Sequence, residues 1–234
     1  MILHRLIRHH VKHRDDAVFY QMQASDAIRW IKENGVPLRP GLKALDLGCG
    51  HGVFGAELAK EGCDISYADF QNSLLPELKG AKFQTMNLDA EDLVKLGEYD
   101  LVICSNVLEH LAKPNLFLSN AQKLLRPEGV LFLSWTNWLS PWGGHEFSPF
   151  HYLGPHYGHV LYDKLVKRPR LHTPFVSLFP TYIGQTLQTI RQNRELRLLA
   201  AAPRYFTNFS FLIHIPIVRE FLVWNCSLLI GRNK

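Results

Sequence analysis

The stretch ALDLGCGHGVFG, residues 44–55, constrains the fold of this chain more than any other. An apolar run predicts a short buried strand that reaches the carboxylate of Asp46, and the spacing of apolar residues over 53–62 predicts a helix. Between them stand three glycines, Gly48, Gly50 and Gly52. Such a loop lies at the carboxyl edge of a parallel sheet, where open α/β folds bind nucleotide-like ligands. The stretch therefore predicts an α/β domain with a ligand site at this edge.

The rest of the chain continues an alternation of strands and helices. Apolar runs predict strands over 43–47, 63–70, 81–88, 99–107, 130–137, 195–202 and 222–231. Helices are expected over 15–34, 53–62, 73–80, 114–129 and 181–194, with Gly129 ending the fourth of them. The run 99–107 is nearly continuous in apolar residues, as in a parallel strand covered on both faces. Five strand–helix units imply a parallel sheet with right-handed crossovers and helices on both faces.

Length and composition suit one domain with additions. The 234 residues, of which 47% are apolar, are ample for the core of an α/β domain. We expect an N-terminal helical cap over 1–40, a ligand-binding core over 41–136, an insertion over 137–180, and a C-terminal helix with the last two strands over 181–234. The insertion is rich in His, Pro, Gly and aromatic residues and is too long for an ordinary connection, which is typical of a lid.

Charge and cysteine usage narrow the class of protein. The net charge of +5 comes largely from two basic runs, His4 to Arg14 and Lys164 to Arg170. A solvated face is the ordinary explanation of such runs, and contact with phosphate or anionic lipid is the alternative. The four cysteines lack C-x-x-C or zinc-ligand spacing, so a thiolate metal or redox centre is not expected. We expect a cytoplasmic location for three reasons. The thiols are expected to be reduced, no apolar core of a signal peptide is found, and no apolar stretch is long enough to span a membrane.

Residues at the ends of the first three strands distinguish between two nucleotide-like ligands. A dinucleotide fingerprint would have a third glycine where Val53 stands, and the carboxylate of Asp46 would repel a pyrophosphate. Asp46 suits instead a ligand with an ammonium group and a sulfonium. Asp69, after the second strand, would accept hydrogen bonds from ribose hydroxyls in either ligand class. Asp89 and Ala90, after the third strand, would read an adenine amino group and leave room for its ring.

These motifs, together with YDLVICSNVLEHL (99–111) and LLRPEG (124–129), resemble the class I S-adenosylmethionine-dependent methyltransferases of the small-molecule type. The resemblance covers Lys43 to Trp135. It implies S-adenosyl-L-methionine as the cofactor. It also implies a doubly wound, mostly parallel seven-stranded α/β sheet, with the last strand antiparallel between the fifth and the sixth.

The resemblance also implies a role for each motif. The glycine loop would lie against the methionine half of the cofactor, and two residues after the fourth strand would line the reacting centre. Phe70 would stack on adenine, with a place in the core as the alternative, and His110 would lie beside the cofactor, with a structural role as the alternative. The implied cofactor-binding residues are Asp46, Gly48, Gly50, Gly52, Asp69, Phe70, Asp89, Ala90, Ser105, Asn106 and His110.

The acceptor site is expected in the insertion, between Trp135 and His159. A hydroxyl acceptor needs a base, and we expect His145 in that role, with Glu146 and His151 as its rivals. The alternatives are that these histidines are structural or that some bind a divalent metal. No H-E-x-x-H spacing occurs, so no metal site is assigned.

The leading hypothesis is therefore a small-molecule methyltransferase, acting on an oxygen of a sugar or lipid-linked glycan. GGHEFSPFHYLG (143–154) and IPIVREFLVWN (215–225) are similar to a bacterial branch associated with cell-envelope polysaccharides. A nicotinamide-dependent oxidoreductase and a nonenzymatic S-adenosylmethionine-binding module are the alternatives. The tetrapeptide N-P-P-Y of base methylases is absent, so a nucleic-acid acceptor is not expected. Residues 209–224 and the basic N-terminus leave peripheral contact with the inner face of a membrane open.

Overall fold

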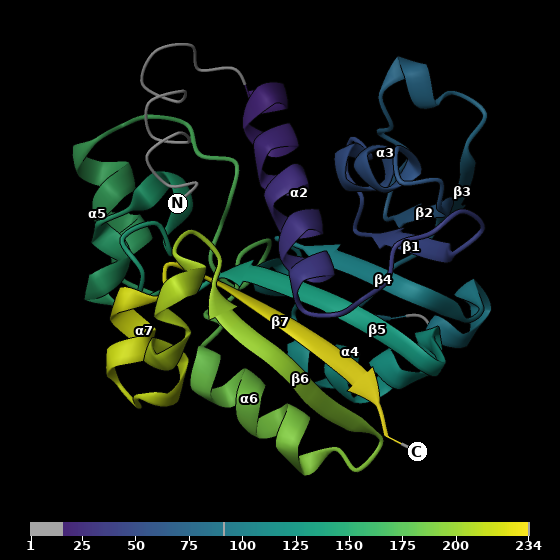
Figure 1. Ribbon diagram of the computed structural model, residues 1–234. Helices are drawn as coiled ribbons and strands as arrows, with labels where there is room; N and C mark the ends of the chain where they lie inside the picture. Colours follow the sequence, from purple (N-terminus) through teal and green to yellow (C-terminus); the bar gives the residue numbers. More distant parts are fainter. Residues whose placement is uncertain (1–15, 91, 234) are drawn as a thin grey trace.

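The chain folds around a seven-stranded sheet with the strand order β3-β2-β1-β4-β5-β7-β6 (Figure 1). The computed structural model describes residues 16–90 and 92–233. The strands are β1 (Lys43–Leu47), β2 (Asp64–Asp69), β3 (Lys82–Thr85), β4 (Tyr99–Ser105), β5 (Leu125–Thr136), β6 (Leu196–Pro203) and β7 (Asn225–Arg232). β1 to β5 pair in parallel, whereas β7 runs antiparallel to β5 and β6. The predicted fold class, with its antiparallel last strand, is confirmed.

Helices cover both faces of the sheet. Successive side chains of a strand point to opposite faces, and apolar side chains on both faces must be buried. The α-helices are α2 (Asp16–Glu33), α3 (Val53–Ala59), α4 (Pro114–Asn120), α5 (Gly158–Leu165), α6 (Ile183–Gln192) and α7 (Val218–Leu222). Ala44 and Leu101 belong to the core cluster that includes α2 and α3, and Leu45 and Val102 to the one that includes α4 and α6. Figure 1 shows these two layers on either side of the sheet.

Short 3-10 turns complete the chain, and several replace expected helix or strand. They are η1 (Pro76–Leu78), η2 (Leu93–Leu96), η3 (Leu108–His110), η4 (Ala121–Leu124), η5 (His145–Phe147), η6 (Phe150–Leu153) and η7 (Thr207–His214). The helix expected over 73–80 is the single turn η1, because Pro76 lacks the N–H that a longer helix needs. The strand expected over 81–88 is reduced to the four residues of β3.

The largest correction concerns residues 114–129, where α4 ends at Asn120, the 3-10 turn η4 follows to Leu124, and β5 then begins at once. Leu125 pairs with Tyr99 of β4, and Arg126 forms two hydrogen bonds of 2.9 Å with the carboxylate of Asp100. Gly129 therefore does not cap a helix. A Cβ there would lie 2.7 Å from the carbonyl oxygen of Tyr99, so the close approach of two strands explains this glycine.

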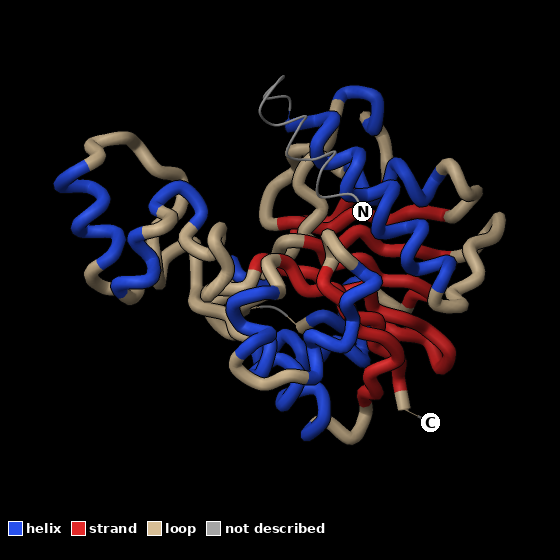
Figure 2. The backbone as a smooth tube through the Cα atoms, turned by 60° about the vertical axis from the view of Figure 1, so that its left-hand side comes forward, coloured by secondary structure: helices blue, strands red, loops and turns tan. Residues whose placement is uncertain are grey.

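The segment between β5 and α6 stands out from the sheet beyond the carboxyl end of β5 (Figure 2). It contains η5, η6 and α5, and it has a small apolar core of its own made by Trp138, Phe147, Tyr162 and Leu178. Its last part returns to the sheet, where the N–H of Phe179 donates to the carbonyl oxygen of Glu109, at 2.7 Å. The segment is thus both separately packed and anchored beside β4.

Two expectations from the sequence concern membrane contact. Among the helices of residues 16–90 and 92–233, none combines the length and apolar character needed to cross a bilayer. The basic run from His4 to Arg14 lies outside the described residues.

Candidate active site

The glycine loop after β1 is shaped by left-handed backbone conformations. Gly48 and Gly50 have φ angles of 68° and 51°. A Cβ at Gly48 would lie 2.3 Å from Cγ2 of Val107, so this glycine lets the loop pack against the residues after β4. A Cβ at Gly50 would meet no atom within 4 Å, and the backbone there faces open space. The loop therefore leaves room for a ligand to approach its backbone at Gly50.

Two carboxylates hold this loop. Asp46 is buried and accepts a hydrogen bond of 2.8 Å from the N–H of Gly55, at the start of α3. Burial raises the pKa of Asp46 to about 7, because the lowering effect of the Gly55 hydrogen bond is small beside burial and the charge of the nearby Asp69 also acts to raise the pKa. Asp69 accepts from the N–H of Gly50 at 2.7 Å and from that of Phe70 at 2.6 Å. Each oxygen of Asp69 keeps a second lone pair for another donor.

Residues after β2 and β3 lie at the same edge. Phe70 is 69% exposed, which removes the core alternative and leaves its ring free beside Asp69. Asp89 accepts from the N–H groups of Ala112 and Lys113, at 3.0 and 2.9 Å, so its carboxylate joins this turn to the segment before α4. Asp89 and Ala90 also line a cavity of about 220 Å³ that reaches toward α4.

A residue that the sequence analysis did not single out, Arg204, connects the strand ends. It is 3% exposed, and its Nη1 donates to the hydroxyl oxygens of Ser105 and Ser134, at 3.0 Å each. A weaker bond of 3.4 Å reaches Oδ1 of Asn106, a residue with a φ of 57°. Burial lowers the pKa of Arg204, and its guanidinium lies 5.4 Å from the ring centre of Phe54. The ends of β4, β5 and β6 are therefore joined through one buried cation.

Three histidines meet where the insertion returns to the sheet. His110 ends η3, His145 begins η5 and His172 lies in the loop after α5, and their ring centres are 5.3, 5.0 and 4.7 Å apart. Burial, together with the neighbouring His110 and His172, lowers the pKa of His145 to about 4. His172 was missed because it lies outside the range predicted for the acceptor site, and no local motif marks it.

Glu146 and His151, the alternatives to His145 as the base, lie in different surroundings. Oε1 of Glu146 lies 2.8 Å from Nδ1 of His172, and this contact lowers the pKa of Glu146 although its burial acts in the opposite direction. His151 is 1% exposed, and its Nε2 lies 2.9 Å from the carbonyl oxygen of Ser140. Glu146 therefore joins the histidine cluster, whereas His151 packs inside the insertion.

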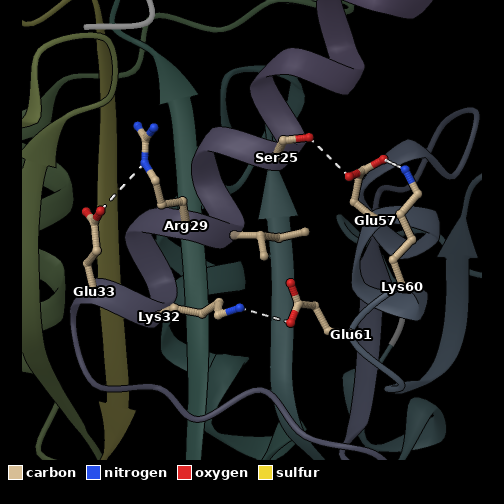
Figure 3. A pocket seen from close by; sticks show the side chains of 8 residues that line it. Ser25, Arg29, Lys32, Glu33, Glu57, Lys60 and Glu61 are labelled. Atoms are coloured by element: carbon tan, nitrogen blue, oxygen red, sulfur yellow. Dashed lines mark hydrogen bonds and ion pairs between the residues drawn. The ribbon is translucent and has the colours of Figure 1, made fainter.

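A groove of about 400 Å³ between α2 and α3 lies apart from these residues. Figure 3 shows the charged side chains that line it, and each of the three cations there is paired with a carboxylate. Lys32 contacts Glu61 at 3.0 Å, and Arg29 contacts Glu33 at 3.6 Å. The groove thus contains no predicted site residue and no unpaired cation among its lining residues.

Comparison with known proteins identifies relatives over nearly the whole chain. A family profile described as a methyltransferase domain matches residues 45–131. An uncharacterized methyltransferase of Mycobacteroides abscessus is 31% identical over 226 residues, which cover 91% of this chain and 86% of that protein. Another, from Mycobacterium leprae, is 29% identical over 233 residues, with coverages of 92% and 82%.

Solved structures share the fold at low sequence identity. An S-adenosylmethionine-dependent methyltransferase from Mesorhizobium loti gives a TM-score of 0.59 at 16% identity, covering 89% of this chain and 98% of its own. Magnesium protoporphyrin IX methyltransferase from Synechocystis, solved with bound SAH, gives 0.55 at 18% identity, with coverages of 93% and 86%.

Proposed function

The chain belongs to the class I S-adenosylmethionine-dependent methyltransferases, and we propose that it methylates an oxygen of a sugar or lipid-linked glycan in bacterial envelope biosynthesis. Its cofactor is S-adenosyl-L-methionine. This membership argues against the nicotinamide-dependent oxidoreductase and the nonenzymatic module that the sequence left as alternatives. The acceptor, its position at the insertion over 137–180 and the residue roles below are our proposal.

Residues after β1 and β2 fit the cofactor. The open space over Gly50 accommodates a ligand, and Asp46 offers a negative charge to a sulfonium and an ammonium group. Asp69 has lone pairs for ribose hydroxyls, and the exposed ring of Phe70 offers a stacking surface for adenine. When bound, the cofactor supplies a methyl group that is already activated for displacement, so the protein must chiefly align the acceptor and exclude water.

One observation carries the assignment of an oxygen acceptor, namely the convergence of His110, His145 and His172 at the carboxyl edge of the sheet. A hydroxyl must lose its proton during methyl transfer, and histidine is the side chain that enzymes use most often for this step. We propose that this cluster, with His145 at its insertion side, promotes the loss of this proton and that Glu146 orients His172. The packed position of His151 makes it a structural residue in this proposal.

Exposed apolar side chains support a sugar-bearing or lipid-bearing acceptor. Trp142 and Tyr157, which are 57% and 77% exposed, present aromatic rings on the insertion, where they suit the apolar face of a sugar. Around η7 and α7 a second group is exposed, made by Phe209, Phe211, Ile217, Phe221 and Leu222. This group supports peripheral contact of a cytoplasmic enzyme with the inner face of the membrane.

The test is transfer of an isotopically labelled methyl group to defined acceptors. Purified protein is incubated with labelled S-adenosyl-L-methionine and with lipid-linked glycans in vesicles, the same glycans without lipid, or a small phenol. We expect label in the glycan after mild base treatment, which cleaves esters but leaves ethers intact. Label in the phenol alone, or label that is lost with base, would contradict the proposed acceptor.

Thermal unfolding provides a separate test of the cofactor. We expect S-adenosylhomocysteine to raise the Tm and NAD to leave it unchanged, because a ligand stabilises the folded state only when it binds that state.

A further inference from the structure

The cluster of His110, His145 and His172 has the features of a metal site. We propose that these three imidazoles bind one divalent transition-metal ion of the zinc type, which in turn binds the acceptor oxygen. Metal binding itself is independent of the proposed function, whereas the role of the ion in catalysis rests on it.

The first argument is convergence. One nitrogen from each ring lies within 4.8 Å of the corresponding nitrogen of the other two. In a tetrahedral zinc site the Zn–N distance is about 2.0–2.1 Å, which sets neighbouring nitrogens about 3.4 Å apart. Small inward rotations of three rings, each on a turn or loop, would close this difference.

The second argument is the way in which the rings are held. Nδ1 of His110 lies 2.7 Å from the carbonyl oxygen of Ser177, and Nδ1 of His172 lies 2.8 Å from Oε1 of Glu146. Both contacts make Nδ1 the protonated nitrogen and leave the lone pair on Nε2. Histidines that bind metals are held in the same way, with one N–H donated to a carbonyl or carboxylate and the other nitrogen on the ion.

The third argument concerns the remaining ring and its support. Nδ1 of His145 is buried and has no hydrogen-bond partner among residues 16–90 and 92–233. A buried imidazole nitrogen without a partner is costly, and an ion would satisfy it. The loop that carries His172 is itself held, since Nη1 of Arg170 donates to the carbonyl oxygen of His172 at 2.7 Å while Asp163 binds the other side of the guanidinium.

The type of ion and its role follow from the donors. Three neutral imidazoles without a thiolate favour zinc, cobalt, nickel or copper over magnesium and calcium. Three protein ligands leave a position open, as in catalytic zinc sites, and an acceptor hydroxyl bound there would have a lowered pKa. Its proton leaves to solvent, its oxygen forms the new C–O bond, and the S–CH₃ bond breaks with its electron pair remaining on sulfur.

The experiment is a titration of the chelator-treated, dialysed full-length protein with Co²⁺, followed by its visible d–d absorption, and then displacement by Zn²⁺. We expect one ion per chain. We expect His145→Ala and His172→Ala to abolish the signal, and Glu146→Ala to weaken binding by about 10–100-fold because His172 loses its hydrogen-bond partner. His156→Ala is the matched control, because His156 is an exposed histidine of the same insertion outside the cluster.

The Co²⁺ titration of the wild-type protein is decisive by itself, so the test does not depend on whether each variant folds. Absence of a stoichiometric Co²⁺ signal, or equal loss in the His156→Ala control, means that the cluster is not a metal site. Full methyl transfer by metal-free protein would also remove the catalytic role of the ion while leaving the proposed function intact. Stoichiometric metal binding without transfer to any glycan would overturn the proposed acceptor and leave the metal site intact.

Discussion

Asp46→Asn should stabilise the protein without cofactor above neutral pH while weakening its affinity for the cofactor. Asp46 is buried, and its carboxylate accepts one backbone hydrogen bond, from Gly55. Burial raises its pKa from 3.8 to about 7. The folded state therefore holds a proton that the unfolded state releases between these values, and the free energy of unfolding falls as the pH rises through this window.

The magnitude follows from the shift. One pKa unit corresponds to about 1.4 kcal/mol, so a rise of some three units costs the folded state on the order of 4 kcal/mol at pH 8 relative to pH 4. Asparagine is nearly isosteric, and its amide oxygen can still accept from the N–H of Gly55. The substitution removes the buried charge, so we expect a gain of about 4 kcal/mol at pH 8 that shrinks to about 1.6 kcal/mol at pH 5, a pH that still lies above the unfolded-state pKa of 3.8.

Urea unfolding at pH 5, 6, 7 and 8 measures the first part, and calorimetric titration with S-adenosyl-L-methionine measures the second. Binding of a cationic ligand should lower the pKa of Asp46, so the wild-type enthalpy at pH 7 should depend on the ionisation enthalpy of the buffer as a proton is released. Asp46→Asn should abolish that dependence. If its stability at pH 8 equals that of the wild type, or if its affinity for the cofactor is unchanged, the electrostatic account of Asp46 is wrong.

Three further substitutions test the other parts of the site. Asp69→Ala should weaken binding of S-adenosylhomocysteine by at least about tenfold, because charge-assisted bonds contribute roughly 1.5–3 kcal/mol each; calorimetric affinity within twofold of the wild type would contradict this. Gly48→Ala should lower the Tm more than Gly50→Ala, since only the former places a Cβ against Val107, whereas Gly50→Ala should reduce cofactor affinity more; the reverse order in either measurement would contradict the proposed ligand position. Arg204→Lys should lower the free energy of unfolding by about 2–3 kcal/mol in urea titrations, because one ammonium cannot replace the planar set of donors; a loss below about 0.5 kcal/mol would show that the guanidinium network is dispensable.

The strands and the cofactor edge of the sheet could be predicted because they depend on local patterns, whereas the place of the last strand between the fifth and the sixth followed from the family resemblance. Apolar runs located all seven strands, and the glycines after β1 located the loop that connects it to α3. The boundary after α4 was misplaced because a glycine required by the approach of β5 to β4 has the same sequence appearance as a helix cap. Gly129 thus shows that composition alone does not reveal which neighbour a glycine must accommodate.

The acceptor side was harder to predict because its residues come together through tertiary packing. His172 contacts His145 and Glu146 only because the loop after α5 folds back onto η5. Arg204 becomes a central donor only when β6 lies near the ends of β4 and β5, separated from β5 by β7. His151 is a histidine of the insertion like His145, and only the packing of the insertion distinguishes the two.

The separate apolar core of the insertion makes this segment a structural unit that can be exchanged between relatives. Trp138, Phe147, Tyr162 and Leu178 hold the segment together without residues from the sheet's own core clusters. Because the proposed acceptor site lies on this segment, we expect that transplanting it between homologues exchanges substrate preference, with donor recognition inherited unchanged from the host. Selection can then act on the two halves of the reaction through different stretches of the gene.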